Sequence, residues 1–144
     1  LGALPVFGTA WIISGAPAAH FIFAAVPPTL WVLNLLFLNE FPDEQPDRRG
    51  GRRTLVIELG FHRARQLYIG LTVLSYLWIA GCILSSAMPP AGLLAFLSLP
   101  FAWRAVALSR QPDFGGHFTQ AQAANVQWVL SAHLLLALGY FFAG

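Results

Sequence analysis

Long apolar runs separated by short polar stretches are the dominant pattern of this chain. They occupy residues 1–14, 18–39, 64–85, 91–108 and 123–143. A helix of about 20 residues crosses a hydrocarbon core of about 30 Å, and most of these runs approach that length. The runs do not alternate apolar and polar residues as lipid-spanning strands do. The pattern therefore predicts an all-α, multi-pass transmembrane bundle of about five helices.

Two of these runs depart from a simple spanning helix. The first is too short to span comfortably, and it starts at Leu1 without an initiator methionine or the basic region of a signal peptide. We therefore expect residues 1–144 to form a single membrane domain that is a piece of a longer protein. The second run contains Pro27 and Pro28, which should kink it, as neighbouring helices permit in membrane proteins.

Composition agrees with a membrane protein and argues against a nucleic-acid partner. The chain is 57% hydrophobic and 10% charged, whereas soluble domains usually contain about 25% charged residues. Its net charge of +2 comes from clustered arginines, with no basic stripe interleaved with aromatic residues. The bilayer is thus the expected partner, and nucleic acid is not.

The arginines also predict an orientation in the membrane. They concentrate at residues 40–63 and 104–122, whereas residues 15–17 and 86–90 carry no charge. Cytoplasmic loops of membrane proteins contain an excess of lysine and arginine. We therefore expect an integral protein of the inner or plasma membrane whose charged loops face the cytoplasm.

Three oxygen-bearing side chains follow one another at four-residue spacing where the second run ends. On a helix, Asn39, Asp43 and Asp47 would share one face. Two carboxylates and an amide oxygen suit Mg²⁺, which completes its shell with water and phosphate, whereas zinc prefers histidine or cysteine. Pro42 and Pro46 also allow a helix end or a broken turn here.

Arginines follow these acids directly. Planar guanidinium groups bind phosphate oxygens in pairs, so the combination suits a metal-bridged diphosphate. Gly50 and Gly51 allow the chain to turn between the arginines, which are Arg48, Arg49, Arg52 and Arg53. The alternative is a solvated loop in which the arginines are balanced by the neighbouring acids Glu40, Asp43, Glu44 and Asp47.

Residues 39–60 resemble the second aspartate-rich motif of the UbiA superfamily of intramembrane prenyltransferases, most closely its 1,4-dihydroxy-2-naphthoate (menaquinone-type) branch. The matching positions are Asn39, Asp43, Asp47, Gly51, Arg52 (lysine in the family), Thr54, Leu55, Leu59 and Gly60. Glu40 and Pro42 depart from the family pattern. Five helices with this motif after the second also resemble the carboxyl-terminal half of the family's nine-helix fold.

The resemblance implies a function for the intact protein. It would transfer an isoprenyl group from a polyprenyl diphosphate to an aromatic acceptor in quinone biosynthesis. Asp43 and Asp47 would be catalytic and would bind Mg²⁺ together with Asn39, while Arg48, Arg52 and Arg53, with Asn39, would hold the diphosphate. The family's first aspartate-rich motif would lie in a missing amino-terminal half, so we expect this piece to be inactive without that half.

Two other classes of protein are alternatives to this assignment. The CDP-alcohol phosphotransferases also carry intramembrane aspartates, but their Asp-Gly-x-x-Ala-Arg and Gly-x-x-x-Asp-x-x-x-Asp elements are absent from the sequence. A non-catalytic membrane transport or interaction module with a solvated loop remains the alternative. Asn34 and His133 are polar residues within apolar runs, and for both we expect hydrogen bonds between helices rather than a role in lining a cavity.

Overall fold

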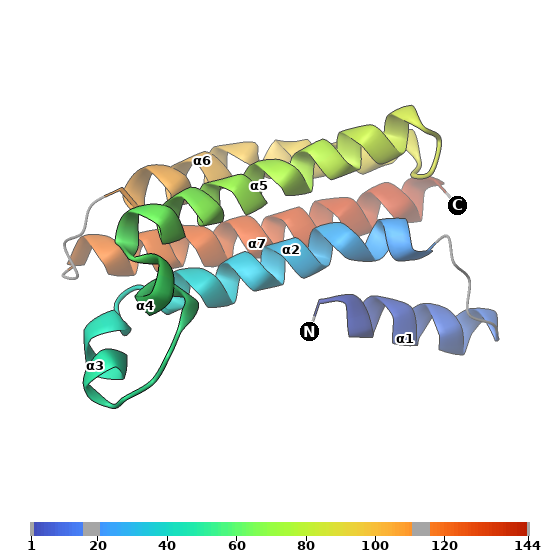
Figure 1. Cartoon of the computed structure of the whole chain (residues 1–144). Coiled ribbons are helices and arrows are strands. Elements are labelled where there is room, and N and C mark those ends of the chain that lie inside the picture. Colours follow the sequence, from blue (N-terminus) through green and yellow to red (C-terminus); the bar gives the residue numbers. More distant parts are fainter. Residues whose placement is uncertain (1, 16–20, 111–115, 144) are drawn as a thin grey trace.

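The computed structural model describes residues 2–15, 21–110 and 116–143, and throughout these residues the regular structure is helical (Figure 1). The apolar helices are α1 (Ala3–Ser14), α2 (Phe21–Asn39), α5 (Phe61–Leu84), the consecutive pair η1 (Pro90–Ser98) and α6 (Leu99–Leu108), and α7 (Gly116–Ala143). Two short helices, α3 (Glu44–Arg49) and α4 (Leu55–Leu59), lie in the charged stretch. The all-α prediction is confirmed.

The apolar helices form an elongated bundle. Four segments of the described chain are long and apolar enough to cross a membrane: Phe21–Asn39, Phe61–Leu84, Pro90–Leu108 and Phe118–Ala143. The remaining apolar helix is shorter and packs against α2, while α3 and α4 extend from one end of the bundle (Figure 1). The prediction of a multi-pass helical bundle is therefore confirmed.

Two helix boundaries differ from those expected. α7 begins at Gly116, whereas the apolar run begins at residue 123, because polar residues form its first turns at the end of the bundle. The fourth run is not one α-helix but a 3₁₀ segment followed by α6. Pro100 lies in the first turn of α6, where its missing N–H is tolerated, so a new helix starts there.

Helix α2 continues through both of its prolines. Pro27 has no N–H, so it cannot donate to the carbonyl of Phe23 four residues earlier. The indole Nε1 of Trp78 on α5 donates to that carbonyl oxygen at 3.1 Å. A neighbouring helix thus satisfies the backbone group that the proline leaves free, as membrane helices require.

A line of buried hydrogen-bonded side chains connects α2, α5, η1 and α7. We call it the polar seam, and it consists of Trp31, Asn34, Tyr68, Thr72, Ser75, Tyr76, Ser98, Asn125 and Trp128. All nine are buried, although every one carries a polar group. Buried polar groups cost free energy unless they are hydrogen-bonded, and each of the nine side chains makes at least one hydrogen bond, although Asn34 Oδ1 has no partner among the described residues.

One part of the seam, around Asn34, joins α2 to α5 and α7. Asn34 Nδ2 donates to Thr72 Oγ1 at 2.9 Å, and the Tyr68 hydroxyl donates to Asn125 Oδ1 at 3.0 Å. Asn125 Nδ2 in turn donates to the backbone oxygen of Asn34 at 3.4 Å. The interhelical hydrogen bond predicted for Asn34 is confirmed.

His133 behaves differently from Asn34. Its Nδ1 lies 2.7 Å from the backbone oxygen of Val129 in the same helix, and its ring contacts Trp31 edge-on at 5.1 Å. It also lines a cavity between α1, α2 and α7. The prediction of an interhelical hydrogen bond is therefore wrong for His133, because its own helix supplies the nearest acceptor.

Candidate functional site

The charged segment, residues 40–58, begins with a turn anchored in the bundle. α2 ends at Asn39, and the Phe41 N–H donates to the Leu38 oxygen at 3.3 Å. Phe41 is completely buried and stacks on Phe118 of α7 at 6.0 Å between ring centroids. Its burial fixes the point from which the acidic residues leave the bundle.

The structure places the three predicted metal ligands on two elements rather than on one helix. Asn39 ends α2, Asp43 precedes α3, and Asp47 lies within α3. The three residues therefore do not share one helical face, and the structure instead has the helix end and broken turn that Pro42 and Pro46 also allowed. Pro42 explains the break, because it disfavours helical geometry at the preceding residue and cannot donate a backbone hydrogen bond.

The two aspartates nevertheless stay close along the chain. The N–H of Asp47 donates to the backbone oxygen of Asp43 at 2.8 Å, so the two residues are one helical turn apart. Asp43 is exposed, whereas the side chain of Asp47 is 15% exposed. Their proposed role as metal ligands remains a prediction.

A left-handed glycine closes α3 and turns the arginines back over it. Gly51 has a φ of 72°, and the next N–H, that of Arg52, donates to the Asp47 oxygen at 2.9 Å. The N–H of Gly51 donates to the Arg48 oxygen at 3.3 Å, which completes a Schellman motif. The turn expected at the glycine pair is thus confirmed, and it holds Arg52 beside Asp47.

Three arginines of the charged segment pair with acids in the structure. Arg48 binds Glu44 at 2.9 Å, Arg52 binds Asp47 at 3.2 Å, and Arg53 binds Glu58 at 2.8 Å. These contacts agree with the view that the acids balance the arginines. Exposed pairs of this kind contribute little to stability, so a phosphate can compete for the guanidinium groups.

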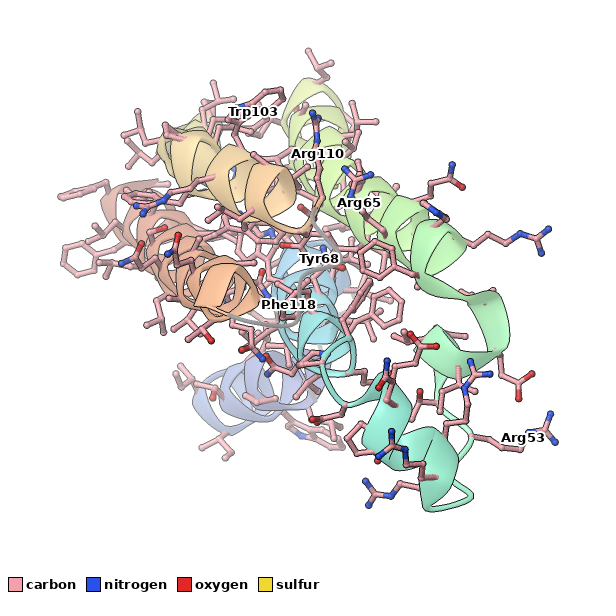
Figure 2. The ribbon with its side chains drawn as sticks, turned by 90° about the vertical axis from the view of Figure 1, so that its left-hand side faces the viewer. Arg53, Arg65, Tyr68, Trp103, Arg110 and Phe118 are labelled. Atoms are coloured by element: carbon pink, nitrogen blue, oxygen red, sulfur yellow. The ribbon has the colours of Figure 1, made fainter. Side chains whose placement is uncertain are left out.

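The Arg53–Glu58 pair is the most exposed of the three. Figure 2 shows Arg53 pointing away from the bundle, whereas Tyr68 and Phe118 lie between the helices. The hydrogen bond and positive charge of Arg53 lower the pKa of Glu58, and Glu58 raises the pKa of Arg53. Both groups are therefore charged at neutral pH.

The end of the charged segment is shaped by two motif residues with local structural roles. Thr54 caps α4, since its Oγ1 accepts a hydrogen bond from the Ile57 N–H at 3.4 Å. Gly60 has φ 71° and ψ 158°, a conformation found essentially only in glycine, and it separates α4 from α5. These two matches to the motif thus direct the chain back into the bundle.

Helix α7 contributes to this site through a residue that the sequence did not single out for it. Gln122 Nε2 donates to Asn39 Oδ1 at 3.1 Å, across 83 residues of sequence. The contact uses one lone pair of the amide oxygen and orients it. Only the tertiary fold brings these residues together, so spacing in the sequence carries no signal of the pairing.

Few side chains near Asp43 could ligate a metal ion. Groups of three or more histidine, cysteine or acidic residues able to hold a metal do not occur among the described residues. However, Glu40 Oε2 is buried without a hydrogen-bond partner in that part of the chain. Mg²⁺ commonly uses one or two carboxylates plus phosphate oxygens and water, so this sparse set is compatible with it.

An apolar cavity of about 780 Å³ lies between α1, α2 and α7. Its walls include Val6, Ile13, Phe21, Pro28, Leu136 and Tyr140. Pro28 precedes Asn39 by eleven residues of α2, or about 16 Å along a helix axis. The bundle thus offers a hydrocarbon-lined volume at some distance from the charged segment.

Comparison with known proteins places the chain in a family. Over 118 residues it is 27% identical to the 1,4-dihydroxy-2-naphthoate octaprenyltransferase of Bacillus subtilis (strain 168), covering 82% of this chain and 38% of that protein. No solved structure matches the chain. The sequence profile of the UbiA prenyltransferase family matches residues 1–118, which include the charged segment. The chain therefore belongs to the UbiA prenyltransferase family.

Proposed function

We propose that the intact protein transfers an isoprenyl group from a polyprenyl diphosphate to an aromatic acceptor in quinone biosynthesis. The family membership and the similar octaprenyltransferase support this reaction. One observation assigns the reaction to particular residues. Asp43 and Asp47 lie one helical turn apart, beside arginines, at the end of an apolar bundle. In this proposal residues 1–144 are one membrane domain that needs the amino-terminal half for turnover.

The charged segment would bind the diphosphate of the donor. Asp43, Asp47 and Asn39 would hold Mg²⁺, which supplies positive charge that stabilises the departing diphosphate. Arg48 and Arg52 would exchange their carboxylate partners for phosphate oxygens, and Arg53 would do the same at the edge of the segment. Gln122 would keep the Asn39 oxygen oriented.

The apolar bundle would shelter the reacting carbon. When the allylic C–O bond breaks, the diphosphate leaves with the electron pair, and an electron-rich aromatic carbon forms the new C–C bond and then loses its proton. Water would quench the cation, so its exclusion favours transfer over hydrolysis. The cavity between α1, α2 and α7 would take part of the isoprenoid chain.

Neutralising the aspartates tests this assignment. Asp43→Asn and Asp47→Asn in the intact protein should each lower prenyl transfer by about 100-fold or more, because stabilisation of the leaving charge is lost. Mn²⁺ binding, followed by electron paramagnetic resonance as a substitute for Mg²⁺, should weaken in parallel. Glu58→Gln is the matched control, since it removes an exposed carboxylate from the same segment and should leave both readouts unchanged.

Two results would contradict the proposal. Full transfer activity in both aspartate variants would exclude Asp43 and Asp47 from the reaction. Loss of activity with unchanged Mn²⁺ affinity would show that the aspartates are needed for transfer but do not bind the metal. Equal unfolding temperatures of the variants and the unmodified protein are expected, because neither carboxylate lies in the buried core.

We also propose that the charged segment faces the cytoplasm. The argument is the positive-inside rule applied to the arginines around α3. An Arg49→Cys variant should react with a membrane-impermeant maleimide in inside-out vesicles and not in right-side-out ones. The natural Cys82 is buried, so it should contribute little background. The opposite labelling pattern would reverse the orientation.

A further inference from the structure

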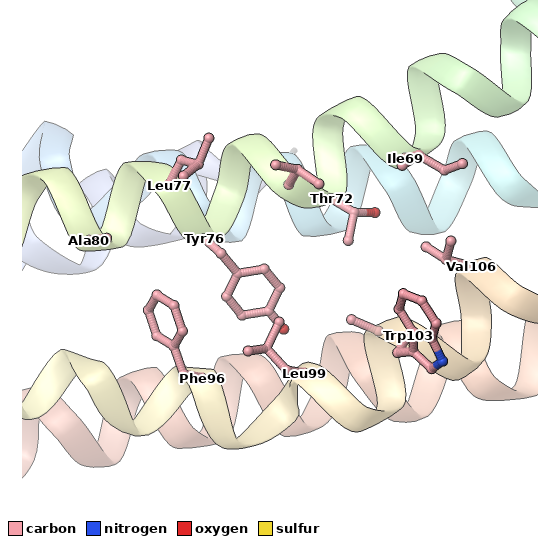
Figure 3. A pocket seen from close by; sticks show the side chains of 11 residues that line it. Ile69, Thr72, Tyr76, Leu77, Ala80, Phe96, Leu99, Trp103 and Val106 are labelled. Atoms are coloured by element: carbon pink, nitrogen blue, oxygen red, sulfur yellow. The ribbon is translucent and has the colours of Figure 1, made fainter.

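A second apolar groove lies on another face of the bundle, between α5 and the pair η1 and α6. It has a volume of about 300 Å³ (Figure 3). Its walls include Ile69, Val73 and Leu77 of α5 and Leu99, Trp103 and Val106 of the opposite helix. Several of these side chains are widely exposed, from 42% at Leu99 to 69% at Trp103. The groove therefore opens outward, where the acyl chains of a bilayer would meet it.

Two arginines stand at one end of this groove. Arg65 precedes Ile69 by one helical turn on α5, and Arg110 follows Val106 by one turn just after α6. The two helices run in opposite directions, so both arginines lie toward the same end of the groove (Figure 1). They are close enough for the charge of Arg110 to act on Arg65.

This pair of like charges lacks a counterion among the described residues. The ion pairs found there all belong to the charged segment and include neither Arg65 nor Arg110. The Nε of Arg65 is buried and has no hydrogen-bond partner in the same part of the chain. A buried donor without a partner and an unbalanced pair of cations both cost free energy, and a bound anion would remove both costs.

We propose that this groove binds one anionic phospholipid, with its phosphate between Arg65 and Arg110 and one acyl chain along the groove. Guanidinium groups bind phosphate oxygens in bidentate fashion, and basic pockets between membrane helices accommodate anionic headgroups. A phosphodiester carries a single negative charge and needs no metal. The site is distinct from the diphosphate site of the proposed reaction, and it does not depend on that proposal.

The first test compares two lipids with identical acyl chains on the intact protein in a neutral detergent. Native mass spectrometry should show phosphatidylglycerol binding about 10- to 30-fold more tightly than phosphatidylcholine, since each arginine near a lipid phosphate contributes about fivefold. The double variant R65Q/R110Q should lose this preference. The double variant R63Q/R104Q should retain it, because it removes two exposed arginines from the same helices without touching the pair.

A groove variant tests the acyl chain separately. Val73 is 50% exposed at the edge of the groove, so Val73→Trp should fill it without disturbing the core. Val73→Trp should weaken the binding of both lipids. This test is independent of R65Q/R110Q, so it remains informative if that variant fails to fold.

Several outcomes would overturn the proposal. One is the absence of a preference for phosphatidylglycerol in the unmodified protein, as expected if another segment of the protein covers the groove. Another is an equal loss of binding in R63Q/R104Q, which would indicate general attraction to a basic surface. Displacement of phosphatidylglycerol by geranyl diphosphate without Mg²⁺ would instead assign the groove to the prenyl donor.

Discussion

The charged segment and the polar seam are both made of polar side chains in an apolar protein, but their hydrogen bonds reach very different distances along the chain. In the charged segment the paired residues are four or five positions apart and exposed. In the seam they are separated by 44 residues for Trp31 and Ser75 and by 52 for Trp128 and Tyr76, and all are buried. The seam therefore joins helices, whereas the charged segment holds only its own shape.

This difference leads us to expect opposite effects of substitution. Seam residues should control the free energy of unfolding, because removing one partner leaves the other buried and unpaired. Residues of the charged segment should control transfer activity with little effect on stability, because water replaces the lost partner.

The largest effect on stability should come from Trp128. It is fully buried, and its Nε1 donates to the Tyr76 hydroxyl at 2.8 Å. Trp128→Ala should lower the free energy of unfolding by about 3–5 kcal/mol, through both the cavity and the lost hydrogen bond, although the Tyr76 hydroxyl keeps its bond with Ser98 Oγ at 2.7 Å. Unfolding of the intact protein in mixed detergent micelles measures this. Trp11→Ala is the control, because Trp11 is 59% exposed on α1, and a similar loss there would erase the distinction.

A smaller effect is expected where α7 and η1 approach most closely. A Cβ on Gly139 would collide with the backbone oxygen of Ala91, and backbone cannot move aside as a side chain does. Gly139→Ala should therefore destabilise the protein by about 1–3 kcal/mol. Gly81 on α5 has open space around it, so Gly81→Ala should be neutral or slightly stabilising in the same unfolding assay. Equal effects at both glycines would contradict the tight packing.

Substitutions of two asparagines of α2 give the most direct comparison of the polar seam with the proposed metal site. Asn34→Ala should cost about 1 kcal/mol of stability, because it removes the hydrogen bond to Thr72 from the seam. Asn39→Ala, five residues later, should leave stability unchanged and lower prenyl transfer, since Asn39 is exposed at the proposed metal site. The same unfolding and transfer assays on both variants decide the matter. The reverse pattern would show that the roles of the two regions are exchanged.

The smallest expected effect concerns the Arg53–Glu58 pair. Arg53 lowers the pKa of Glu58 in the folded protein, so the pair stabilises the fold above the unfolded pKa of Glu58. That stabilisation is lost as the pH falls through the lower, folded pKa. In a carbon-13 NMR titration, R53Q should raise the Glu58 pKa toward its ordinary value. R49Q should not, because Arg49 forms no ion pair within the described residues, and an equal shift would point to general charge screening.

Much of the bundle could be predicted because apolar length is a local property. The run ending at Asn39 and the run around Tyr76 each became one helix close to its expected bounds. The break before α6 follows from Pro100, and the early start of α7 at Gly116 adds polar residues to the helix, so apolar length alone reveals neither.

The candidate site was less predictable, because part of its geometry depends on contacts between distant parts of the chain. The turn at Gly51 follows from the glycine pair and agrees with the sequence. For Asn39, Asp43 and Asp47 the sequence left open a single helical face or a broken turn, and the structure has the broken turn because Pro42 outweighs the four-residue spacing. The contact of Asn39 with Gln122 joins distant parts of the chain, so it depends on tertiary packing.

The winding of η1 affects how this protein matches the thickness of its bilayer. A 3₁₀ helix rises about 2.0 Å per residue, against about 1.5 Å in an α-helix. The segment Pro90–Leu108 has 19 residues, nine of them in η1, so it extends about 33 Å rather than the 28 Å or so of a uniform α-helix. The stretched half lets a short segment cross a hydrocarbon core of about 30 Å with little deformation of the lipid. Rewinding η1 into an α-helix would shorten this segment by about 5 Å and would draw one membrane surface inward at this helix.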